Sequence, residues 1–452
     1  RKLDSMALLL EFEHYLRAAS KLVWGEFFLI PALAFTGLYL TLGLRGFQFR
    51  YFMLSLKTLL KRRNDKSKVK GEISSLQALM TALSATIGTG NIVGVAAAIQ
   101  IGGRGAVFWM WIVAILGMAT KFSEGFLAVK FREKDRFGSR IGGPMYYIKN
   151  GLGSRWAFLA ITFAISGTVA AFGIGNTVQA NAVAKAAQQY FHISVNITGL
   201  LMAALTALVL IGGIKRIGSV AEKIVPGMAF MYIGMSLIVI TLNYEMIPSV
   251  LKSIVSEAFA LPSAGGAGVW LALRWGFARG IFSNEAGLGS AAIAHAAART
   301  NKPVEQGMIA MLGTFIDTIL ICTITALVIL ITLPINTDLS AALLAAKAFE
   351  TVFGSLGGQL VAIALCLFAF TTILGWSYYG EKCAQYLFGD KIILPYRIIW
   401  IFAVYIGAIT EFELIWLMAD ILNGLMALPN LIALVLLSPT IFKATTEFRK
   451  KI

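Results

Sequence analysis

Cysteine, histidine and charged residues are all scarce in this chain of 452 residues. The three cysteines form no CxxC pair, so the sequence predicts neither a disulfide framework nor a redox motif. Only 14% of the residues are charged, whereas a soluble chain of this size carries about a quarter. Because 58% of the residues are hydrophobic, a disordered chain is excluded as well. These shortages exclude an ordinary water-soluble enzyme.

The residues that catalysis requires are not clustered either. The three histidines are scattered without metal-ligand spacing, and no nucleophile has a base and an orienting group near it in the sequence. We therefore expect no enzyme activity and no organic cofactor. A channel would need rings of charge along a continuous pore, and the sequence shows local breaks instead.

Long hydrophobic runs account for most of the chain. A membrane-spanning helix needs roughly 20 mainly apolar residues. Eleven runs meet this requirement, at about residues 23–44, 73–101, 105–129, 156–187, 196–213, 219–242, 268–297, 305–333, 356–382, 396–410 and 414–439. The sequence therefore predicts an all-α integral membrane protein with about eleven transmembrane helices.

The stretch before the first run is amphipathic. Phe12 and Leu16 share one helical face, and Arg17 lies on the other. A helix of this kind lies on the membrane surface rather than crossing it. We therefore expect an amphipathic surface helix over residues 1–22.

Basic residues indicate how the chain is oriented. If the connections between spans are assigned alternately to the two sides, 28 of the 39 Lys and Arg residues fall on one side and 8 on the other. By the positive-inside rule the richer side is cytoplasmic, which places the N-terminus outside and the C-terminus inside. This asymmetry explains the net charge of +16, so we expect contact with membrane lipid and no nucleic-acid partner.

Two of the runs are interrupted at mid-depth by glycine and small polar residues. The first interruption is Ser84–Asn91, and the second is Gly280–Gly287, about 195 residues later. An odd number of spans separates them, so the second half of the chain has the opposite orientation in the membrane. Paired interruptions in inverted halves mark the binding site of a secondary transporter. Close helix packing is the alternative explanation for Gly88, Gly90 and Gly94.

The interruptions provide ligands for both signs of charge. Half-helix N-termini offer N–H groups to a carboxylate, and half-helix C-termini offer carbonyl oxygens to sodium. Asp317 is an ionisable residue in mid-membrane, and such a residue is functional by default. It could coordinate sodium, carry a proton, or form a structural ion pair with Arg274 or Arg279.

Polar residues also recur at helical spacing within other spans. Phe172, Asn176 and Gln179 are spaced i, i+4, i+7, which places them on one face of a regular helix. Two amides and an aromatic ring suit a small zwitterion, and polar contacts between helices are the alternative. Lys121 and Glu124, three residues apart, are interpreted as a local ion pair on one helix face.

Five segments carry a more specific pattern. They are Ser84–Asn91 with Gly94, Gly102–Gly117 (beginning GGRGAVFWMW), Ile141–Tyr147 (IGGPMYY), Gly280–Ser290 (GIFSNEAGLGS) and Thr371–Tyr379. Together they resemble the motifs of the alanine or glycine:cation symporter family, which includes sodium:alanine symporters. The matches extend over roughly residues 70–440, so the resemblance covers nearly the whole chain.

The resemblance implies a LeuT-type fold, in which ten core helices form two inverted repeats of five, preceded here by one extra helix. The implied divisions are 1–22 for the surface helix, 23–72 for the extra helix and a basic cytoplasmic loop, 73–242 and 243–440 for the repeats, and 441–452 for a cytoplasmic tail. It also implies sodium-coupled uptake of alanine or glycine across the cell membrane, and we expect a monomer. Proton coupling through Asp317 or Glu285 is the alternative. The preference between alanine and glycine, and between L- and D-alanine, is left open.

The resemblance further implies which residues bind the ligands. The backbone amides of Thr89 and Gly90 are expected to hold the substrate carboxylate, within a site formed by Thr89, Gly90, Asn91, Phe172, Asn176, Gln179, Ile281, Phe282, Ser283 and Trp376. One sodium ion is expected at the carbonyls of Ser84 and Ile87 and the hydroxyls of Thr371 and Thr372. A second sodium ion, beside the substrate, is expected at Thr86, Asn91, Asn284 and Asp317.

Overall fold

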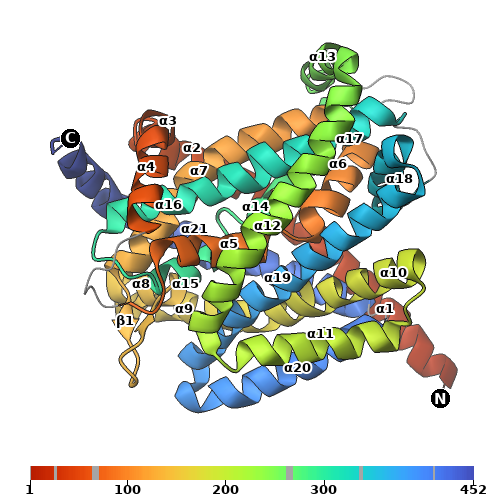
Figure 1. Cartoon of the computed structure of the whole chain (residues 1–452). Coiled ribbons are helices and arrows are strands. Elements are labelled where there is room, and N and C mark those ends of the chain that lie inside the picture. The colour runs from red at the N-terminus through yellow and green to blue at the C-terminus, as the bar shows by residue number, and fades with distance from the viewer. Residues whose placement is uncertain are drawn as a thin grey trace.

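The computed structural model describes residues 2–24, 28–63, 71–260, 268–334, 339–410 and 413–451. Within these ranges the chain consists of helices and their connections, apart from one short antiparallel hairpin. In that hairpin β1 (Glu133–Lys134) pairs with β2 (Arg140–Ile141), and Glu133 lies opposite Ile141. The mostly helical architecture predicted from the hydrophobic runs is confirmed (Figure 1).

The helices of the first half begin with four elements before the first interrupted helix. These are α1 (Lys2–Val23), α2 (Leu29–Gly43), α3 (Phe47–Arg50) and α4 (Phe52–Arg63). The following ones are α5 (Ser75–Thr86), the π-helix η1 (Gly90–Gly94), α6 (Val95–Gly102), α7 (Gly105–Lys130), α8 (Pro144–Leu152), η2 (Ser154–Trp156), α9 (Ala157–Phe172), the π-helix η3 (Gly173–Thr177), α10 (Val178–Phe191), α11 (Val195–Leu210) and α12 (Gly213–Leu242).

The second half repeats this order of an interrupted helix followed by longer ones. Its elements are η4 (Tyr244–Met246), α13 (Ile247–Glu257), α14 (Val269–Asn284), α15 (Ser290–Ala296), α16 (Pro303–Thr314), the π-helix η5 (Phe315–Cys322), α17 (Thr323–Thr332), α18 (Ala341–Phe353), α19 (Ser355–Phe388), η6 (Asp390–Ile392), α20 (Ile393–Ile409) and α21 (Glu413–Arg449).

Seven of the described helices are long and apolar enough to cross a membrane, and an eighth is the bent pair of α5 with η1 and α6. The other predicted spans are α2 and α11, which are apolar but contain only 15 and 16 residues, and α14 with α15, which is interrupted. A straight span needs roughly 20 residues. The count of eleven therefore stays a prediction, while the chain as an integral membrane protein is supported by these long apolar helices.

Both predicted interruptions are present, but each is shorter than the sequence indicated. In the first, α5 continues to Thr86 and only residues 87 and 88 leave the helix, with a bend of 56° between the two parts. In the second, α14 continues to Asn284, so the prediction that the break begins at Gly280 is wrong. The chain unwinds at Glu285, which has a φ of 55°, and stays unwound through Gly289, with a φ of 81°. Intrahelical hydrogen bonds hold α14 together until this reversal of φ ends them.

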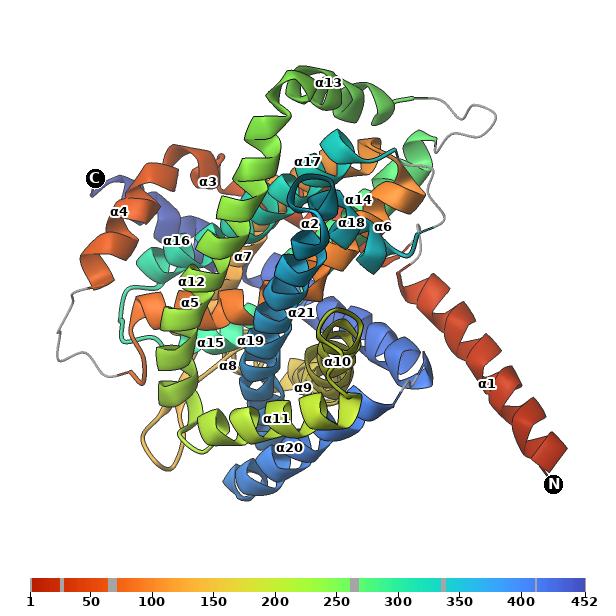
Figure 2. The same ribbon diagram turned by 45° about the vertical axis from the view of Figure 1, so that its right-hand side comes forward.

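The two interrupted helices lie in the middle of the molecule, between long helices. On one side α7 packs against α14 and α16, and on the other α19 packs against α9, α10 and α18. Figures 1 and 2 show α5, α15 and α19 close together at the centre, with α11 and α20 along one edge and α1 projecting from the body. The backbone next to α5 also pairs with that next to α15, since Arg299 N donates to Ile73 O at 2.8 Å. The segments next to the two interrupted helices are therefore joined through their backbones.

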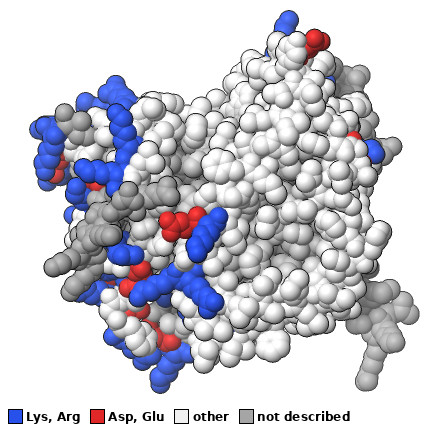
Figure 3. Space-filling view, viewed as in Figure 1, with Lys and Arg blue, Asp and Glu red and all other residues white. Residues whose placement is uncertain are grey.

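Basic side chains gather at one end of the molecule. Figure 3 shows Lys and Arg concentrated over the end that carries α3, α4, the β1–β2 hairpin and the C-terminus, whereas few appear at the other end. We call the first the basic end. The long helices run between the two ends, so the alternation of charge read from the sequence corresponds to a spatial separation.

The contact between α19 and α5 depends on a glycine. A Cβ added at Gly375 would lie 2.8 Å from the backbone nitrogen of Ala85 and 2.8 Å from Ser84 Oγ. We predict that Gly375→Val lowers the free energy of unfolding by ~1–3 kcal/mol because the two helices must separate. Thermal unfolding of the purified protein measures this. Gly234→Ala in α12, where no atom lies within 4 Å of the new Cβ, is the control and should leave the unfolding midpoint near the wild-type value. Equal midpoints for the two variants would contradict the prediction.

Candidate functional site

Asn91 joins the two interrupted helices. Its Oδ1 accepts a hydrogen bond from the backbone N–H of Gly88 at 2.9 Å, which closes the first break on itself. Its Nδ2 donates to Asp317 Oδ1 at 2.8 Å and to Ser283 Oγ at 3.0 Å. Asn91 and Ser283 are fully buried. The side chain of Asn91 therefore connects both breaks to the carboxylate of Asp317 rather than facing an open cavity.

Asp317 is surrounded by polar donors, and none of its hydrogen-bond partners in the described part of the chain is a cation. Ser283 Oγ donates to Asp317 Oδ2 at 2.7 Å, and Thr318 Oγ1 donates to the same oxygen at 2.8 Å. Among the described residues no ion pair joins Asp317 to an arginine, so the alternative of a structural bridge to Arg274 or Arg279 is not supported. The π-helix η5 carries Asp317 beside the end of α14. A buried carboxylate with hydroxyl and amide neighbours presents the oxygen ligands that sodium prefers.

Asn284 lies next to this cluster. Its Nδ2 donates to Thr318 Oγ1 at 3.1 Å, and its Oδ1 accepts from the backbone N–H of Ala286 at 2.9 Å. The second bond caps the end of α14 just where the chain unwinds. The structure therefore brings together Asn91, Asn284 and Asp317 as expected, with Ser283 and Thr318 beside them.

Only one of the two threonines on α19 reaches the first break. Thr372 Oγ1 lies 3.3 Å from the carbonyl oxygen of Ile87. Both hydroxyls donate to the Phe368 carbonyl at 2.9 Å, but the other contact of Thr371 is with Met228 Sδ at 3.6 Å. Successive residues of an α-helix point about 100° apart, so adjacent side chains do not face the same partner. The expectation that both hydroxyls face the break is therefore wrong for Thr371.

The hydroxyls of two other expected residues on α5 hydrogen-bond within their own helix, while the carbonyl of Ser84 as a sodium ligand stays a prediction. Ser84 Oγ donates to Thr81 O at 2.8 Å, and Thr86 Oγ1 lies 3.3 Å from Ala82 O. Back-bonding of this kind is common for hydroxyls in helices. Thr86 O and Ile87 O nevertheless remain at the C-terminal end of α5, where carbonyl groups have no partner further along the helix.

A cavity of about 500 Å³ begins at the first break. Thr89, Gly90 and Phe282 line its inner part, and exposed residues such as Lys185 and Ser340 line its outer part. These outer residues belong to α10 and to the start of α18, at the end of the molecule opposite the basic end (Figure 1). The first backbone amides of η1 border this cavity. The N-terminal amides of a helix have no hydrogen-bond acceptor within their own helix. They are suited to bind a carboxylate.

The predicted stripe of Phe172, Asn176 and Gln179 does not share one face. The ring of Phe172 packs 5.1 Å from that of Trp400, and Asn176 Nδ2 donates to Trp400 O at 2.9 Å, so both face α20. Only Gln179 reaches the first break, where its Nε2 lies 3.3 Å from Thr89 Oγ1. The π-helix η3 lies between them and adds a residue to the turn, which rotates everything after it. The prediction that Phe172 and Asn176 contact the substrate is therefore not supported by their positions.

Two further predicted substrate residues lie outside the cavity lining. Ile281 is buried in the core, and its carbonyl accepts from the backbone N–H of Glu285 at 2.8 Å. Trp376 is also buried, and its Nε1 donates to Glu285 Oε1 at 3.0 Å. Ser290 Oγ hydrogen-bonds the other carboxylate oxygen of Glu285. Trp376 and Glu285 thus link α19 to the second break.

A second buried cluster surrounds Glu124. Its Oε1 accepts hydrogen bonds from the backbone N–H groups of Gly287 at 2.9 Å and Gly289 at 3.1 Å, and from Asn430 Nδ2 at 2.8 Å. Lys121 Nζ lies 3.9 Å from Glu124 Oε2 and donates to Glu285 O at 3.2 Å. The pair predicted as local is therefore buried and holds the unwound segment of the second break. The only sequence signal was that both charges fall within an apolar span.

Comparison with known proteins agrees with this architecture. The chain matches the model of the sodium:alanine symporter family over residues 10–452. It is 50% identical to an uncharacterized transporter of Haemophilus influenzae, over 97% of each chain, and 46% identical to the sodium/alanine symporter AgcS of Methanococcus maripaludis, over 98% of each chain.

Among solved structures, the crystal structure of MhsT in complex with L-phenylalanine has a TM-score of 0.57 at 13% identity, covering 81% of this chain and 89% of MhsT. At this identity the likeness shows the fold alone, which is the LeuT-type transporter fold. The matched family consists of symporters, so the chain is an integral membrane transporter and not an enzyme. The chain belongs to the sodium:alanine symporter family.

Proposed function

We propose that the protein carries a small neutral amino acid, alanine or glycine, into the cell together with sodium. The observation that supports this most strongly is the oxygen-rich cluster of Asn91, Ser283 and Asp317, which lies where the two interrupted helices meet. The cavity next to it ends at the amides of the first break. The relative from Methanococcus maripaludis is named a sodium/alanine symporter.

In the proposed mechanism the substrate carboxylate binds the amides of Thr89 and Gly90, and sodium binds the oxygen atoms around Asp317. A second sodium ion binds between Ile87 O and Thr372 Oγ1. Bound ions stabilise both breaks in the geometry that the amino acid requires, so each ligand raises the affinity for the other. Alternating access follows when the bundle that contains the interrupted helices rocks against α9, α10, α19 and α20.

The proposed topology has eleven spans, with α2, α11 and the pair α14–α15 crossing in addition to the long helices. The spans from α5 to α12 and from α14 to α21 then form two inverted repeats, as the repeated order of elements suggests. The basic end lies in the cytoplasm, in keeping with the positive-inside rule. The large cavity consequently opens to the outside, and the protein acts as a monomer.

Uptake of labelled alanine into proteoliposomes tests this function. Inward sodium, compared with potassium at fixed pH, is expected to drive concentrative uptake. Uptake that is independent of sodium and follows an imposed proton gradient would contradict sodium coupling and favour the second candidate, in which a proton is carried by Asp317 or Glu285. The observation behind that candidate is that both carboxylates are buried at the breaks.

The two threonines on α19 give a matched pair of variants. We predict that Thr372→Ala raises the sodium concentration for half-maximal uptake by ~10-fold, because one hydrogen-bonding oxygen next to Ile87 O is removed. Thr371→Ala should change this concentration little, since its hydroxyl faces Met228. Sodium titration of initial uptake rates measures both. A larger effect of Thr371→Ala would contradict the assignment of the ion site.

A further inference from the structure

Arg279 lies in the wall between two cavities and is partly buried. It lines the 500 Å³ cavity together with Gly90 and Phe282, and it also lines a second cavity of about 210 Å³ beside Trp275. Its guanidinium carbon lies 5.0 Å from the ring centre of Trp275 and 5.8 Å from that of Phe282. Its Nε is buried without a hydrogen-bond partner. Within the described part of the chain, the guanidinium therefore rests on aromatic rings and forms no ion pair.

The nearest acid is engaged elsewhere. Asp420 lines the smaller cavity with Arg279, but its Oδ2 accepts a hydrogen bond from Ser20 Oγ at 2.9 Å. Trp24 Nε1 donates to the backbone oxygen of the same residue at 2.9 Å. These hydrogen bonds of Asp420 connect α21 to α1 and to the residue that follows it. Asp420 is a charge of opposite sign close to Arg279, but no ion pair joins the two side chains in the described structure, so the guanidinium keeps donors for a second anion at membrane depth.

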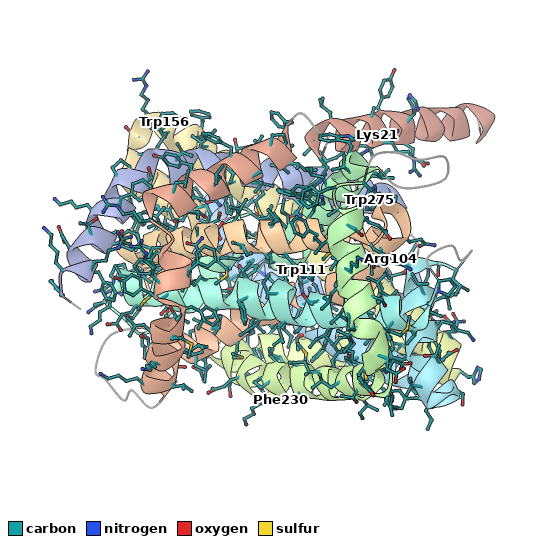
Figure 4. The ribbon with its side chains drawn as sticks, turned by 90° about the horizontal axis from the view of Figure 1, so that it is seen from above. Lys21, Arg104, Trp111, Trp156, Phe230 and Trp275 are labelled. Atoms are coloured by element: carbon teal, nitrogen blue, oxygen red, sulfur yellow. The ribbon has the colours of Figure 1, made fainter. Side chains whose placement is uncertain are left out.

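The chemistry of the larger cavity indicates what that anion is. Among the residues that line the cavity, the charged ones are Arg279 and Lys185, and both are cations. Figure 4 shows Trp275, one turn before Arg279 on α14, well apart from Trp156. Arg279 lies on α14 between the start of this helix at Val269 and the second break at Glu285, and it borders the cavity whose outer part Lys185 lines. An incoming zwitterion meets this cation before it reaches the first break.

We propose that Arg279 is an entry site for the carboxylate group of the amino-acid substrate. Guanidinium groups bind carboxylates in a two-point geometry that a lysine does not reproduce. Phe282 separates the entry site from the first break, because a Cβ at Gly90 would lie 3.4 Å from Phe282 Cδ1. The carboxylate is released by Arg279 and passes this ring to reach the amides of Thr89 and Gly90. This inference rests on the proposed amino-acid transport and adds a residue that increases the rate of substrate capture.

The test compares the concentration dependence of labelled alanine uptake in proteoliposomes at saturating sodium. Arg279→Gln is expected to raise KM for alanine by ~10-fold or more, with Vmax and the sodium dependence close to wild type. Arg279→Lys should give an intermediate KM, because the charge remains without the planar fork. Arg274→Gln is the matched control, since it removes the same charge from α14 but Arg274 lines the smaller cavity and not the larger one. Its KM should stay near the wild-type value.

Two results would overturn the inference. The first is a KM for alanine in Arg279→Gln that equals the wild-type value. The other is an equal loss of Vmax in Arg279→Gln and Asp420→Asn with no further loss in the double variant, because that would identify the two residues as a closing contact. If Arg279→Gln does not reach the membrane, the KM of Arg279→Lys decides in the same way. Wild-type protein that transports another amino acid would correct the proposed substrate alone, and the KM comparison is then made with that amino acid. Wild-type protein that transports no amino acid would overturn both proposals.

Discussion

Replacing Asp317 with asparagine is expected to lower sodium-driven alanine accumulation by ~100-fold or more. The carboxylate is the one formal negative charge among the partners of Asn91, Ser283 and Thr318 in the described structure. Asparagine has nearly the same shape but turns an NH₂ group toward donors that need an acceptor, and it removes the charge that balances a buried sodium ion. Uptake and exchange of labelled alanine in proteoliposomes measure the effect.

The pattern of loss distinguishes the two coupling ions. If Asp317 binds sodium, exchange should also fail at low sodium and recover in part at high sodium. If Asp317 carries a proton, accumulation should disappear while exchange continues at any sodium concentration. Asp390→Asn is the control, because Asp390 pairs with Arg136 at 2.7 Å near the β1–β2 hairpin, far from the breaks. Wild-type accumulation by Asp317→Asn would contradict both roles.

The position of the two breaks could be predicted from sequence because glycine and small polar residues are unusual inside apolar runs. The residues at which each break begins and ends could not be predicted, because unwinding depends on which backbone N–H and C=O groups find hydrogen-bond partners in the folded protein. Gly280 remains helical, whereas Glu285, which has a side chain, adopts a φ of 55°. Its carboxylate is held by Trp376 and Ser290 from two other helices, and those tertiary bonds offset the strain.

Side-chain direction was the second part that the sequence did not determine. Thr371 and Thr372 are adjacent, and the facing helix rather than the sequence decides which of them meets Ile87. For Phe172 and Asn176 the regular 3.6-residue period was assumed, and η3 breaks that period. A π-helix has no clear sequence signature beyond its glycines, so the directions of these side chains could not be predicted at the place where the helix passes the site.

The charged pair on α7 shows a third limit. Spacing alone predicts a local ion pair on one helix face for residues three apart, and such pairs contribute little to stability when they are exposed. Burial changes this expectation, because Lys121 and Glu124 have side chains that are 4% and 1% exposed. Burial arises from the packing of α7 against α14, α15 and α21, which are more than a hundred residues away in the sequence. The unwound segment 285–289 also had to be close before Glu124 could bind its amides.

Replacing Glu124 with alanine is expected to destabilise the protein by ~3–5 kcal/mol, because an uncompensated buried charge remains at Lys121. The amides of Gly287 and Gly289 and the side chain of Asn430 also lose their acceptor. Glu124→Gln keeps an oxygen acceptor and should lose less, about 1–3 kcal/mol. Thermal unfolding of the purified protein gives the order wild type, Glu124→Gln, Glu124→Ala.

A surface ion pair provides the comparison for this prediction. Glu257 Oε1 lies 3.4 Å from Nη1 of Arg104 at the start of α7. The side chain of Glu257 is 40% exposed and that of Arg104 is 34% exposed. Glu257→Ala should therefore cost less than about 1 kcal/mol. If Glu124→Ala unfolds at the same temperature as Glu257→Ala, Glu124 does not stabilise the second break. If Glu124→Ala unfolds at a much lower temperature than Glu257→Ala, the geometry of Ser283 and Asn284 depends on a carboxylate on α7. The sodium affinity of Glu124→Gln should then fall together with its stability.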